Sequence, residues 1–429
     1  MARKKKRKKK NKIVGLIFII LVVLFVGGFF FLQHNVKEIQ RIEYQKKLEK
    51  LEQDIKSHYS TSVKVNTDAK LYIYTDEEYL ESGTIKNGEI ISLDEQVITY
   101  QDEYFKIKEL GDIYYINYKD VIPTDDIYLN NDRYKKYIPF NENIVTNDNV
   151  NFYDQDDKLI YNIRESLSLP IIIKYGDKYG VVFNDRLLIV KNDDVKEIVK
   201  SDNTNLSSTN AIAVLNYHFF YDETKDSERK DCNQIICHSK SLFESHLKYF
   251  KDNNIFTPTM EEYEMWYDKK INLPKSVLIT IDDGWRMQIG IDLLEQYKLN
   301  GTVFLITSWF KEEIKFLHDY EYVHFHSHGD NLHNQGECPG GQGGAIKCAS
   351  KSRLLDDLAL SRKKLEGSTF FCYPFYEYNS YSISVLKEAG FTMAFAGGGR
   401  STRNSNRYAI PRYVVYNNTS TGQLKSYIG

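Results

Sequence analysis

The sequence predicts an α/β barrel for residues 211–429, preceded by small all-β units and by an N-terminal membrane-spanning helix. Three observations support this fold class. After Ala211, buried-type strands alternate with amphipathic helices in about seven repeats, as they do in α/β barrels. Residues 60–200 hold short runs rich in Tyr, Ile and Val that are broken by Asp, Asn and Gly, which is typical of small β units. Residues 13–32 carry no charge and are rich in Ile, Leu, Val and Phe.

The N-terminal segment combines a basic tail with an apolar run. Residues 3–12 read RKKKRKKKNK, so we expect residues 1–12 to be a cytoplasmic tail and residues 13–33 to be a transmembrane helix. Twenty apolar residues in a helix span about 30 Å, the thickness of a bilayer core. The rest of the chain is then extracellular, held at the cell membrane by a single span.

Two alternatives explain the N-terminal segment less well. A nuclear-localisation or nucleic-acid-binding role for the basic block leaves the adjacent apolar run without a purpose. A cleaved signal peptide is the closer alternative, but Gly27-Gly28 is followed by three phenylalanines and not by a small-residue cleavage site. We therefore expect an uncleaved anchor.

Residues 34–59 are expected to form a helical stalk. Apolar residues recur there near heptad spacing among many charges, namely Ile39, Ile42, Leu48, Leu51 and Ile55. The repeat is shorter than four heptads, but it permits a short coiled coil and hence a stalk-mediated oligomer. The net charge of the whole chain is −2, so the composition gives no reason to expect a nucleic-acid partner.

The middle of the chain predicts two small β domains, residues 60–125 and 140–200. The stretch VNTDAKLYIYTDEE at 65–78 resembles VTNDNVNFYDQDDK at 145–158, which suggests two copies of one unit. Both are similar in a general way to bacterial SH3-like domains. Exposed tyrosines on such units could bind glycan or peptide, although core and edge-strand packing is the simpler explanation. Residues 201–210 are polar and are expected to be a linker.

The five cysteines fit an extracellular domain, because disulfides persist outside the cell. Cys232 with Cys237, and Cys338 with Cys348, are each close enough in sequence to close a loop, although sequence cannot fix the pairing. No CxxC pair is present, so a zinc site made by these cysteines is less favoured. Cys372 lies in an apolar run and is expected to be a buried free thiol.

The C-terminal domain is expected to alternate strands with helices. The expected strands are 211–217, 277–281, 301–306, 322–326, 369–373 and 392–396. The expected helices are 241–253, 289–297, 352–365 and 380–390. In α/β barrels, the chemistry takes place where the strands end in loops.

Two of these strand ends carry residues typical of metal-assisted hydrolysis. Asp282 and Asp283 end a strand, where adjacent side chains point to opposite sides, so one can bind a metal while the other accepts a proton. His328 and His333 lie on a later loop and could bind the same ion, with His324 and His328 as an alternative pair. Two histidines and a carboxylate, with positions left for water and substrate, form an open catalytic site. A metal lowers the pKa of bound water to about 7.

These motifs resemble those of the polysaccharide deacetylases of carbohydrate esterase family 4. Thr280–Gly284 reads TIDDG and matches the family's T-[FI]-D-D-G motif. Ser327–His333 reads SHGDNLH and is similar to the S-H-[ST]-x-x-L-H motif of poly-N-acetylglucosamine deacetylases. Gly329 stands where those proteins have Ser or Thr, so a loop-shaping hydroxyl is missing. The resemblance covers roughly residues 211–429, and the order and spacing of the motifs make it specific.

The resemblance implies a fold and roles for these residues. The fold is the distorted (β/α) barrel of the polysaccharide deacetylases. Asp282 corresponds to the catalytic base. The metal ligands correspond to Asp283, His328 and His333, with Zn²⁺ as the first candidate and Co²⁺ or Ni²⁺ as alternatives.

A third motif of the family resembles Cys372–Tyr376, which reads CYPFY. The family usually has Arg-x-Pro-Tyr or Tyr-Pro-Tyr-Gly here, and the arginine is absent from this chain. The resemblance implies that this loop lines the substrate groove and lends a backbone N–H to the oxyanion. The substrate-binding residues that it implies are Tyr373, Pro374 and Tyr376.

Arg412 and His218 resemble two further family positions. Arg412 lies in the sequence IPR, which is similar to a closing Pro-Arg strand whose arginine supports the catalytic aspartate; a purely structural ion pair is the alternative. His218 follows a Tyr and resembles the Tyr-His that opens the domain, although a core histidine would look the same. Trp285 is a candidate sugar platform or an ordinary packing residue.

The general acid is left open by the sequence. No histidine follows His333, so the Leu-x-His acid of many relatives has no counterpart. The candidates are His218, Asp282 on its return step, or a water molecule.

The sequence as a whole predicts a membrane-anchored extracellular N-deacetylase that acts on an N-acetylglucosamine-containing glycan of the cell wall or an exopolysaccharide. A wall-binding or scaffolding protein with an impaired site is one alternative, motivated by Gly329 and by the missing arginine and late histidine. An O-acetyl esterase that uses the same site is another.

Overall fold

The computed structural model describes most of the chain from residue 36 onward. The described residues are 36–47, 49–50, 53, 62–92, 100–101, 104–108, 113–124, 132–184, 186–201, 207–311 and 313–429. The predicted basic tail and transmembrane helix, residues 1–33, lie outside them. No helix within the described ranges is long and apolar enough to cross a membrane. Residues 36–47 and 49–50 are helical, as predicted for this segment, while its role as a stalk and any oligomer remain predictions.

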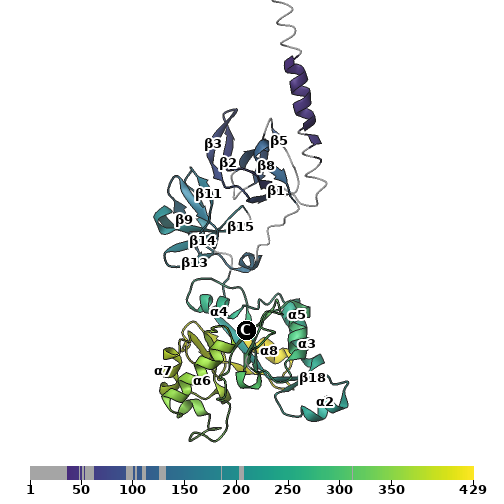
Figure 1. Cartoon of the computed structure of the whole chain (residues 1–429), viewed down its shortest axis with the longest axis vertical. Coiled ribbons are helices and arrows are strands. Elements are labelled where there is room, and N and C mark those ends of the chain that lie inside the picture. The colour runs from purple at the N-terminus through teal and green to yellow at the C-terminus, as the bar shows by residue number, and fades with distance from the viewer. Residues whose placement is uncertain are drawn as a thin grey trace, which may run out of the picture. The chain divides into compact units, whose positions relative to one another are not determined.

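The chain divides into two compact units (Figure 1). Unit 1 comprises Met1–Asn130, Asn147–Ser166 and Phe183–Leu188. Unit 2 comprises Asn131–Thr146, Leu167–Val182 and Ile189–Gly429. The predicted second β domain, residues 140–200, therefore contributes segments to both units.

Unit 1 is built of short antiparallel strands, as its Tyr- and Ile-rich runs predict. Its described strands are β1 (Ser62–Val65), β2 (Ala69–Thr75), β3 (Glu78–Ile85), β4 (Ile90–Ser92), β5 (Tyr100–Gln101), β6 (Tyr104–Lys108), β7 (Ile113–Asn117), β8 (Val121–Pro123), β10 (Val150–Tyr153) and β11 (Leu159–Ile163). Strand β3 pairs with both β2 and β11, so strands from the two predicted β domains share one sheet. The likeness to SH3-like domains, and the predicted domain boundaries, remain predictions.

A small β region precedes the barrel in sequence. It contains β9 (Glu142–Thr146), β12 (Ser168–Pro170), β13 (Ile173–Lys174), β14 (Lys178–Phe183), β15 (Arg186–Lys191) and β16 (Val195–Lys200). Strand β9 pairs antiparallel with β12 and β16.

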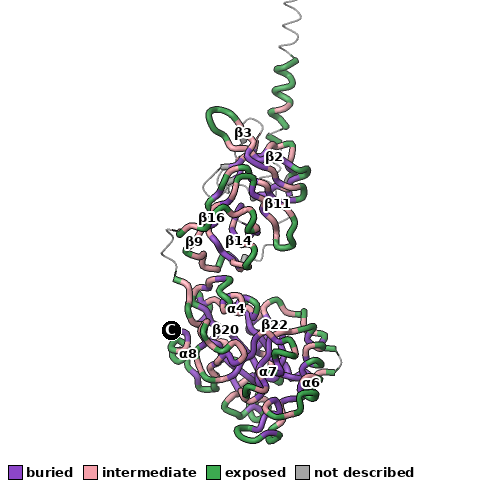
Figure 2. The backbone as a smooth tube through the Cα atoms, turned by 90° about the vertical axis from the view of Figure 1, so that its left-hand side faces the viewer, coloured by how far each residue is buried: buried purple, intermediate pink, exposed green. Residues whose placement is uncertain are grey.

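The centre of unit 2 is a parallel sheet. In spatial order the strands are β24 (Met393–Phe395), β23 (Phe370–Cys372), β22 (Val323–Ser327), β21 (Gly301–Leu305), β20 (Val277–Asp283) and β17 (Ala211–Tyr217). Every residue of β20 is buried, which explains why this strand is a continuous apolar run and not an alternating one (Figure 2). All six strands were predicted, with ends that differ by no more than two residues.

The last part of the chain joins the two ends of this sheet. Ile410 forms a parallel bridge with Phe395 of β24, and β26 (Tyr413–Val414) pairs with β17 at the other end. The sheet therefore closes into a distorted barrel. Because Arg412 lies between these two pairings, the closing segment carries its side chain toward the barrel interior, where it is 0% exposed.

Helices flank the barrel sheet (Figure 1). The four predicted helices are α3 (Lys240–Asp252), α5 (Gln288–Tyr297), α6 (Lys351–Lys364) and α7 (Ser380–Glu388). The sequence did not predict α2 (Asp226–Asp231), α4 (Met260–Tyr267), α8 (Thr421–Ile428), β18 (Phe219–Tyr221), β19 (Cys237–Ser239) or β25 (Ser401–Thr402). The cap of α3 is Ser239, whose hydroxyl accepts a hydrogen bond from the backbone N–H of Leu242. Both predicted disulfides are present, and Cys372 is a buried free thiol as expected.

Candidate active site

An open cleft of about 610 Å³ lies at the carboxyl ends of the parallel strands. Four of these strands or the turns that follow them supply His218, Asp282, Asp283, Trp309 and His328 to its lining. The placement agrees with the rule that barrel chemistry occurs where strands end.

Arg412 holds Asp282 with two hydrogen bonds. Its Nη1 donates to Oδ1 over 2.8 Å and its Nη2 donates to Oδ2 over 2.7 Å. The Arg412 side chain is 0% exposed and that of Asp282 is 2% exposed, so this is a buried, bidentate ion pair. Burial alone raises the pKa of Asp282, but the guanidinium outweighs that effect and the pKa is lowered overall. Asp282 is therefore an ionised carboxylate in a fixed orientation at the cleft.

Asp283, His328 and His333 converge on one point. The Nε2 atoms of His328 and His333 lie 3.2 and 3.4 Å from Oδ1 of Asp283. Four ligands placed tetrahedrally at about 2.0–2.1 Å from an ion are separated by about 3.3 Å, so these spacings suit Zn²⁺. Oδ1 of Asp283 is buried without a hydrogen-bond donor, which fits a cation as its partner.

Both histidines turn Nε2 toward the shared point. Nδ1 of His328 lies 2.8 Å from the carbonyl oxygen of Cys372, so Nδ1–H donates there and Nε2 is the atom left for a metal. Burial lowers the pKa of His328, but Cys372 and Asp283 outweigh that effect and the pKa is raised overall, so a cation bound at this point would displace the proton on Nε2. The pKa of His333 is lowered to about 4, mainly by burial and then by the nearby His328, so its imidazole is neutral. The residues present therefore fit a divalent metal.

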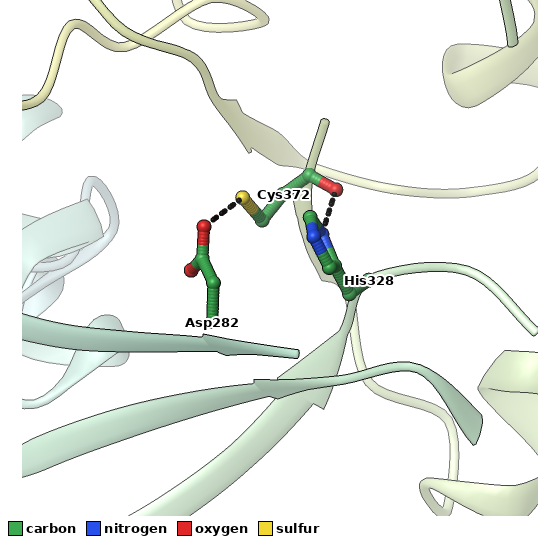
Figure 3. A group of neighbouring side chains, drawn as sticks. All are labelled: Asp282, His328 and Cys372. Atoms are coloured by element: carbon green, nitrogen blue, oxygen red, sulfur yellow. Dashed lines mark hydrogen bonds between the residues drawn. The ribbon is translucent and has the colours of Figure 1, made fainter. Parts of the chain in front are cut away.

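A second group of possible ligands, Asp282, His328 and Cys372, does not fit a metal (Figure 3). Nη2 of Arg412 lies 2.8 Å from the Cys372 sulfur and 2.7 Å from Oδ2 of Asp282. A permanent cation already occupies the position that the ion would need. Burial raises the pKa of the Cys372 thiol, so it is not a ready thiolate ligand.

The loop that carries the two histidines is held by polar contacts from α6. Both oxygens of the Asp357 carboxylate accept backbone N–H groups, from Asp330 over 2.8 Å and from Asn331 over 2.7 Å. Gly329 adopts φ +83°, and a Cβ there would lie 3.2 Å from Leu332. The loop therefore favours glycine at this position.

His218 and Tyr376 face the cleft beside Asp282. Nδ1 of His218 is buried without a partner, and Nε2 lies 3.5 Å from the Tyr376 hydroxyl. That hydroxyl also donates to Asn216 over 2.5 Å. Burial lowers the pKa of His218, although Asp282 and Asp283 partly oppose this effect.

The other predicted substrate residues differ in their placement. Tyr373 lines the cleft, and its hydroxyl donates to the carbonyl of Tyr408 over 2.9 Å. Pro374 is buried and starts the short helix η6 (Pro374–Tyr376), while Trp285 is 41% exposed and packs edge-on against Phe219. Neither Pro374 nor Trp285 is among the lining residues, so their roles in binding remain predictions. His324 lies on β22 and belongs to neither ligand group.

Several lining residues were not predicted from the sequence. They are Phe219, Gln234, Ile236, Trp309, Gln335, Gln342, Phe375, Val414 and Tyr416. Trp309 lies in the short turn that follows β21, so its position near a strand end could have indicated it. The three glutamines lie on irregular loops, where no motif marks them.

Comparison with known proteins agrees with this geometry. Residues 269–394 match the family model described as polysaccharide deacetylase. A poly-beta-1,6-N-acetyl-D-glucosamine N-deacetylase of Staphylococcus aureus (strain MSSA476) is 26% identical over 253 residues, which cover 51% of this chain and 84% of the relative.

Two solved structures also align with about half of this chain. The Streptococcus pyogenes deacetylase PplD, in complex with acetate, aligns with a TM-score of 0.42 and 17% identity over 52% of this chain and 100% of that chain. A de-N-acetylase from Aggregatibacter actinomycetemcomitans aligns with a TM-score of 0.43 and 21% identity over 51% of this chain and 99% of that chain.

The family match covers the segment from before β20 to β24, which includes Asp282, Asp283, His328 and His333. The C-terminal part of the chain is therefore a polysaccharide deacetylase domain, and it belongs to a family of hydrolases that act on carbon–nitrogen bonds other than peptide bonds.

Proposed function

We propose that this chain is a metal-dependent N-deacetylase, anchored in the cell membrane and facing outward, that removes acetyl groups from the N-acetylglucosamine units of a neutral glycan. The observation that carries the proposal is the pair of adjacent aspartates at the end of β20. Oδ1 of Asp283 lies 3.2 Å from Nε2 of His328 and 3.4 Å from Nε2 of His333, while Asp282 forms a separate ion pair with Arg412.

The chemistry divides between the metal and the side chains. A Zn²⁺ ion held by Asp283, His328 and His333 would lower the pKa of a water molecule and polarise the acetamide carbonyl. Asp282 accepts the proton of the attacking water, and Arg412 keeps its two oxygens oriented toward the cleft. The C–N bond breaks, acetate leaves, and the sugar nitrogen takes up a proton to become an amine.

His218 is the side chain best placed to supply that proton. Apart from Asp282, the metal ligands and the tyrosines, it is the remaining titratable side chain of the cleft lining in the described chain. Its Nδ1 has no protein partner, so a substrate atom can bond to it. Burial lowers the pKa of His218, so its imidazole is mainly neutral at neutral pH and would have to take up a proton during the reaction before donating it to the leaving nitrogen.

The lining of the cleft favours an uncharged sugar chain. No lysine or arginine is among the described lining residues, so an acidic glycan would find no cation to pair with. Glutamine amides and aromatic rings provide hydrogen bonds and stacking surfaces for hydroxyl and acetamide groups. The relative from Staphylococcus aureus is named for a poly-N-acetylglucosamine substrate, which supports the same class of glycan.

The predicted anchor and the disulfides support an extracellular location. Cys232–Cys237 and Cys338–Cys348 are both bonded, and such bonds persist in oxidising compartments. Accessibility of the C-terminal domain to protease added outside intact cells tests this location. Protection from the protease would contradict it.

The decisive experiment measures acetate release from poly-N-acetylglucosamine, peptidoglycan and short chitooligomers, with wild type and Asp282→Asn compared. We expect release from poly-N-acetylglucosamine by the wild type, and loss of release in the variant without loss of zinc. Undiminished activity in Asp282→Asn would refute the base assignment. A purified protein that binds neither zinc, cobalt nor nickel would instead favour the scaffolding alternative.

A further inference from the structure

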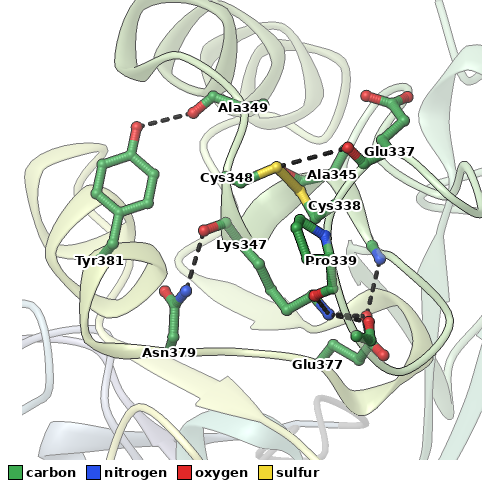
Figure 4. The surroundings of a disulfide bond; sticks show 12 residues. Glu337, Cys338, Pro339, Ala345, Lys347, Cys348, Ala349, Glu377, Asn379 and Tyr381 are labelled. Carbon is green, nitrogen blue, oxygen red and sulfur yellow. Dashed lines mark hydrogen bonds and ion pairs between the residues drawn. A yellow bond between two sulfur atoms is a disulfide. The ribbon is translucent and has the colours of Figure 1, made fainter.

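A loop closed by a disulfide borders the cleft through Gln342. Cys338 and Cys348 are bonded, and the segment between them, residues 339–347, begins with the sequence PGGQGG (Figure 4). Gln342 in this segment and Gln335 just before it both line the cleft. No hydrogen bond involves the side-chain amide of either glutamine in the described part of the chain. Each amide is therefore available to a ligand.

The backbone of this loop is folded tightly and depends on glycine. Gly336, Gly340, Gly341 and Gly343 all have φ between +61° and +80°. Backbone hydrogen bonds cross the loop from Gly336 to Gln342 over 2.8 Å and from Cys338 to Gly343 over 3.0 Å. A Cβ on Gly343 would lie 2.6 Å from the backbone nitrogen of Gly336. The loop therefore has a defined conformation that its own backbone hydrogen bonds stabilise.

Glu377 holds this loop in place through hydrogen bonds and an ion pair. Its Oε1 accepts the backbone N–H of Gln342 over 2.6 Å, and its Oε2 accepts that of Gly344 over 2.8 Å. Lys347 pairs with the same carboxylate at 3.0 Å and also donates to the carbonyl of Gly340 over 2.5 Å. The Glu377 side chain is 14% exposed, so these bonds are largely shielded from water. A side chain on Gly341 would overlap the Glu377 carboxylate, which explains the glycine at that position.

Glu377 comes directly after Phe375 and Tyr376 in the sequence, and both of these residues line the cleft. Phe375 and Tyr376 have φ of 58° and 60°, a left-handed conformation that is unfavourable for residues other than glycine. The Phe375 ring lies 4.2 Å from the ring of His333, a metal-ligand candidate. The glycine-rich loop, the aromatic substrate loop and the metal site are therefore connected through consecutive residues.

We propose that the loop 338–348 is a substrate-binding wall in which Gln342 hydrogen-bonds a sugar unit beside the one that is deacetylated, and that Glu377 is the residue that positions Gln342. The inference rests on the proposed function for the identity of the substrate. A glutamine amide both donates and accepts hydrogen bonds, so it suits hydroxyl and acetamide groups of a neutral sugar. Glu377 contacts no substrate and acts only through the loop.

Kinetics with two substrates test the inference on the zinc-loaded full chain. The substrates are a β-1,6-linked N-acetylglucosamine tetrasaccharide, which reaches the wall, and 4-nitrophenyl acetate, which does not. The variants are Gln342→Ala, Glu377→Gln and their double variant. Glu337→Gln is the matched control, because Glu337 lies beside the loop but pairs with Arg353 and is not among the lining residues.

We expect Gln342→Ala and Glu377→Gln each to lower kcat/KM for the tetrasaccharide about tenfold more than for the ester, mainly through KM; tenfold corresponds to about one lost hydrogen bond. The double variant should be no worse than Glu377→Gln alone, because both changes remove the same contact. Glu337→Gln should leave kcat/KM unchanged for both substrates. Equal losses on both substrates, additive effects in the double variant, or an unchanged tetrasaccharide KM in Gln342→Ala would each overturn the proposal.

Calorimetric binding separates failure of this inference from failure of the proposed function. If the wild type releases no acetate from the tetrasaccharide, the proposed function fails for that glycan. Weaker tetrasaccharide binding by Gln342→Ala than by Glu337→Gln would still support the wall. If wild type and Gln342→Ala bind the tetrasaccharide equally, or neither binds it, the wall is refuted.

Discussion

Replacing Arg412 by Met should destabilise unit 2 far more than breaking a comparable ion pair at the surface. The variant removes two hydrogen bonds to Asp282 and leaves that carboxylate, 2% exposed, without a counter-charge. Breaking one partner of a buried pair costs about 3–5 kcal/mol, because the remaining charge has lost both its hydration and its partner. Arg412 also donates to Thr280 and to the carbonyl of Ala396, each over 3.0 Å, so the upper end of that range is expected.

Arg407 provides the matched control for this experiment. It also pairs with two carboxylates, those of Glu264 and Asp268, but its side chain is 27% exposed. Solvent screens such a pair, so Arg407→Met should cost about 1 kcal/mol, roughly a quarter of the Arg412 effect. The comparison keeps the substitution the same and contrasts a buried pair with a partly exposed one.

Tryptophan fluorescence during urea unfolding is the appropriate assay. The chain has three tryptophans, Trp266, Trp285 and Trp309, and all of them lie in unit 2, so the signal reports on that unit. The measurement is made with chelator present, so that metal binding does not contribute to the free energy of unfolding.

The double variant Asp282→Asn/Arg412→Met identifies the cause of the destabilisation. If the unpaired charge is the reason, the double variant should be more stable than Arg412→Met alone, because an amide is neutral. An effect of Arg412→Met no larger than that of Arg407→Met would refute the reasoning. So would a double variant that is less stable than both single variants.

Three further predictions concern the metal, the loop and the pH. Asp283→Ala should lose stoichiometric zinc in elemental analysis while Asp282→Asn retains it; equal zinc in both would contradict the assignment of ligands. Gly329→Ser should weaken zinc affinity in a chelator competition and cost about 1–2 kcal/mol of stability, since φ is +83°, whereas tighter binding would show that the missing hydroxyl matters more than the backbone. Burial lowers the pKa of His246 to about 4, against about 6.5 in the unfolded chain. Between these pH values the unfolded chain binds more protons, so the free energy of unfolding decreases as the pH falls, by about 2 kcal/mol at pH 5. His246→Gln should reduce the difference in unfolding free energy between pH 7 and pH 5 by about 2 kcal/mol. The remaining difference reflects other histidines whose pKa values burial also lowers, such as His238 and His326, and an unchanged difference would refute this account.

The strands of the barrel were predictable because its central strands are buried on both faces. A run such as Val277–Ile281 can only be a core strand or a core helix, and its shortness and turn residues decide for the strand. Helix α4 was missed since its sequence, MEEYEMWY, has no clear apolar face, and its stability comes from the Thr259 capping box and from tertiary burial of Trp266.

The candidate metal ligands could be identified from the sequence because chemistry restricts the residue types, whereas the cleft walls could not. An open metal site requires histidine and carboxylate ligands, and those leave a recognisable spacing. A wall residue needs only the right position and a suitable side chain. Gln342 is placed by a disulfide, several glycines and a carboxylate 35 residues later, and no local pattern in the sequence reports that arrangement.

The structure gives a physical reason for each of two departures that made the site look impaired from its sequence. The arginine missing from the CYPFY segment leaves Cys372 in its place, but Arg412 reaches the Asp282 carboxylate from the closing segment, with its Nη2 2.8 Å from the Cys372 sulfur. A barrel allows this contact because residues far apart in sequence meet at the same strand ends. Gly329 likewise matches a left-handed backbone position, while Asp357 supplies the loop-holding bonds from α6. An impaired domain would have no reason to keep a buried, bidentate arginine on an aspartate next to an intact ligand set, because a buried ion pair adds little stability over an apolar replacement. The cost of keeping Arg412 is explained if Asp282 must stay ionised and oriented at the cleft, which is what a catalytic base requires.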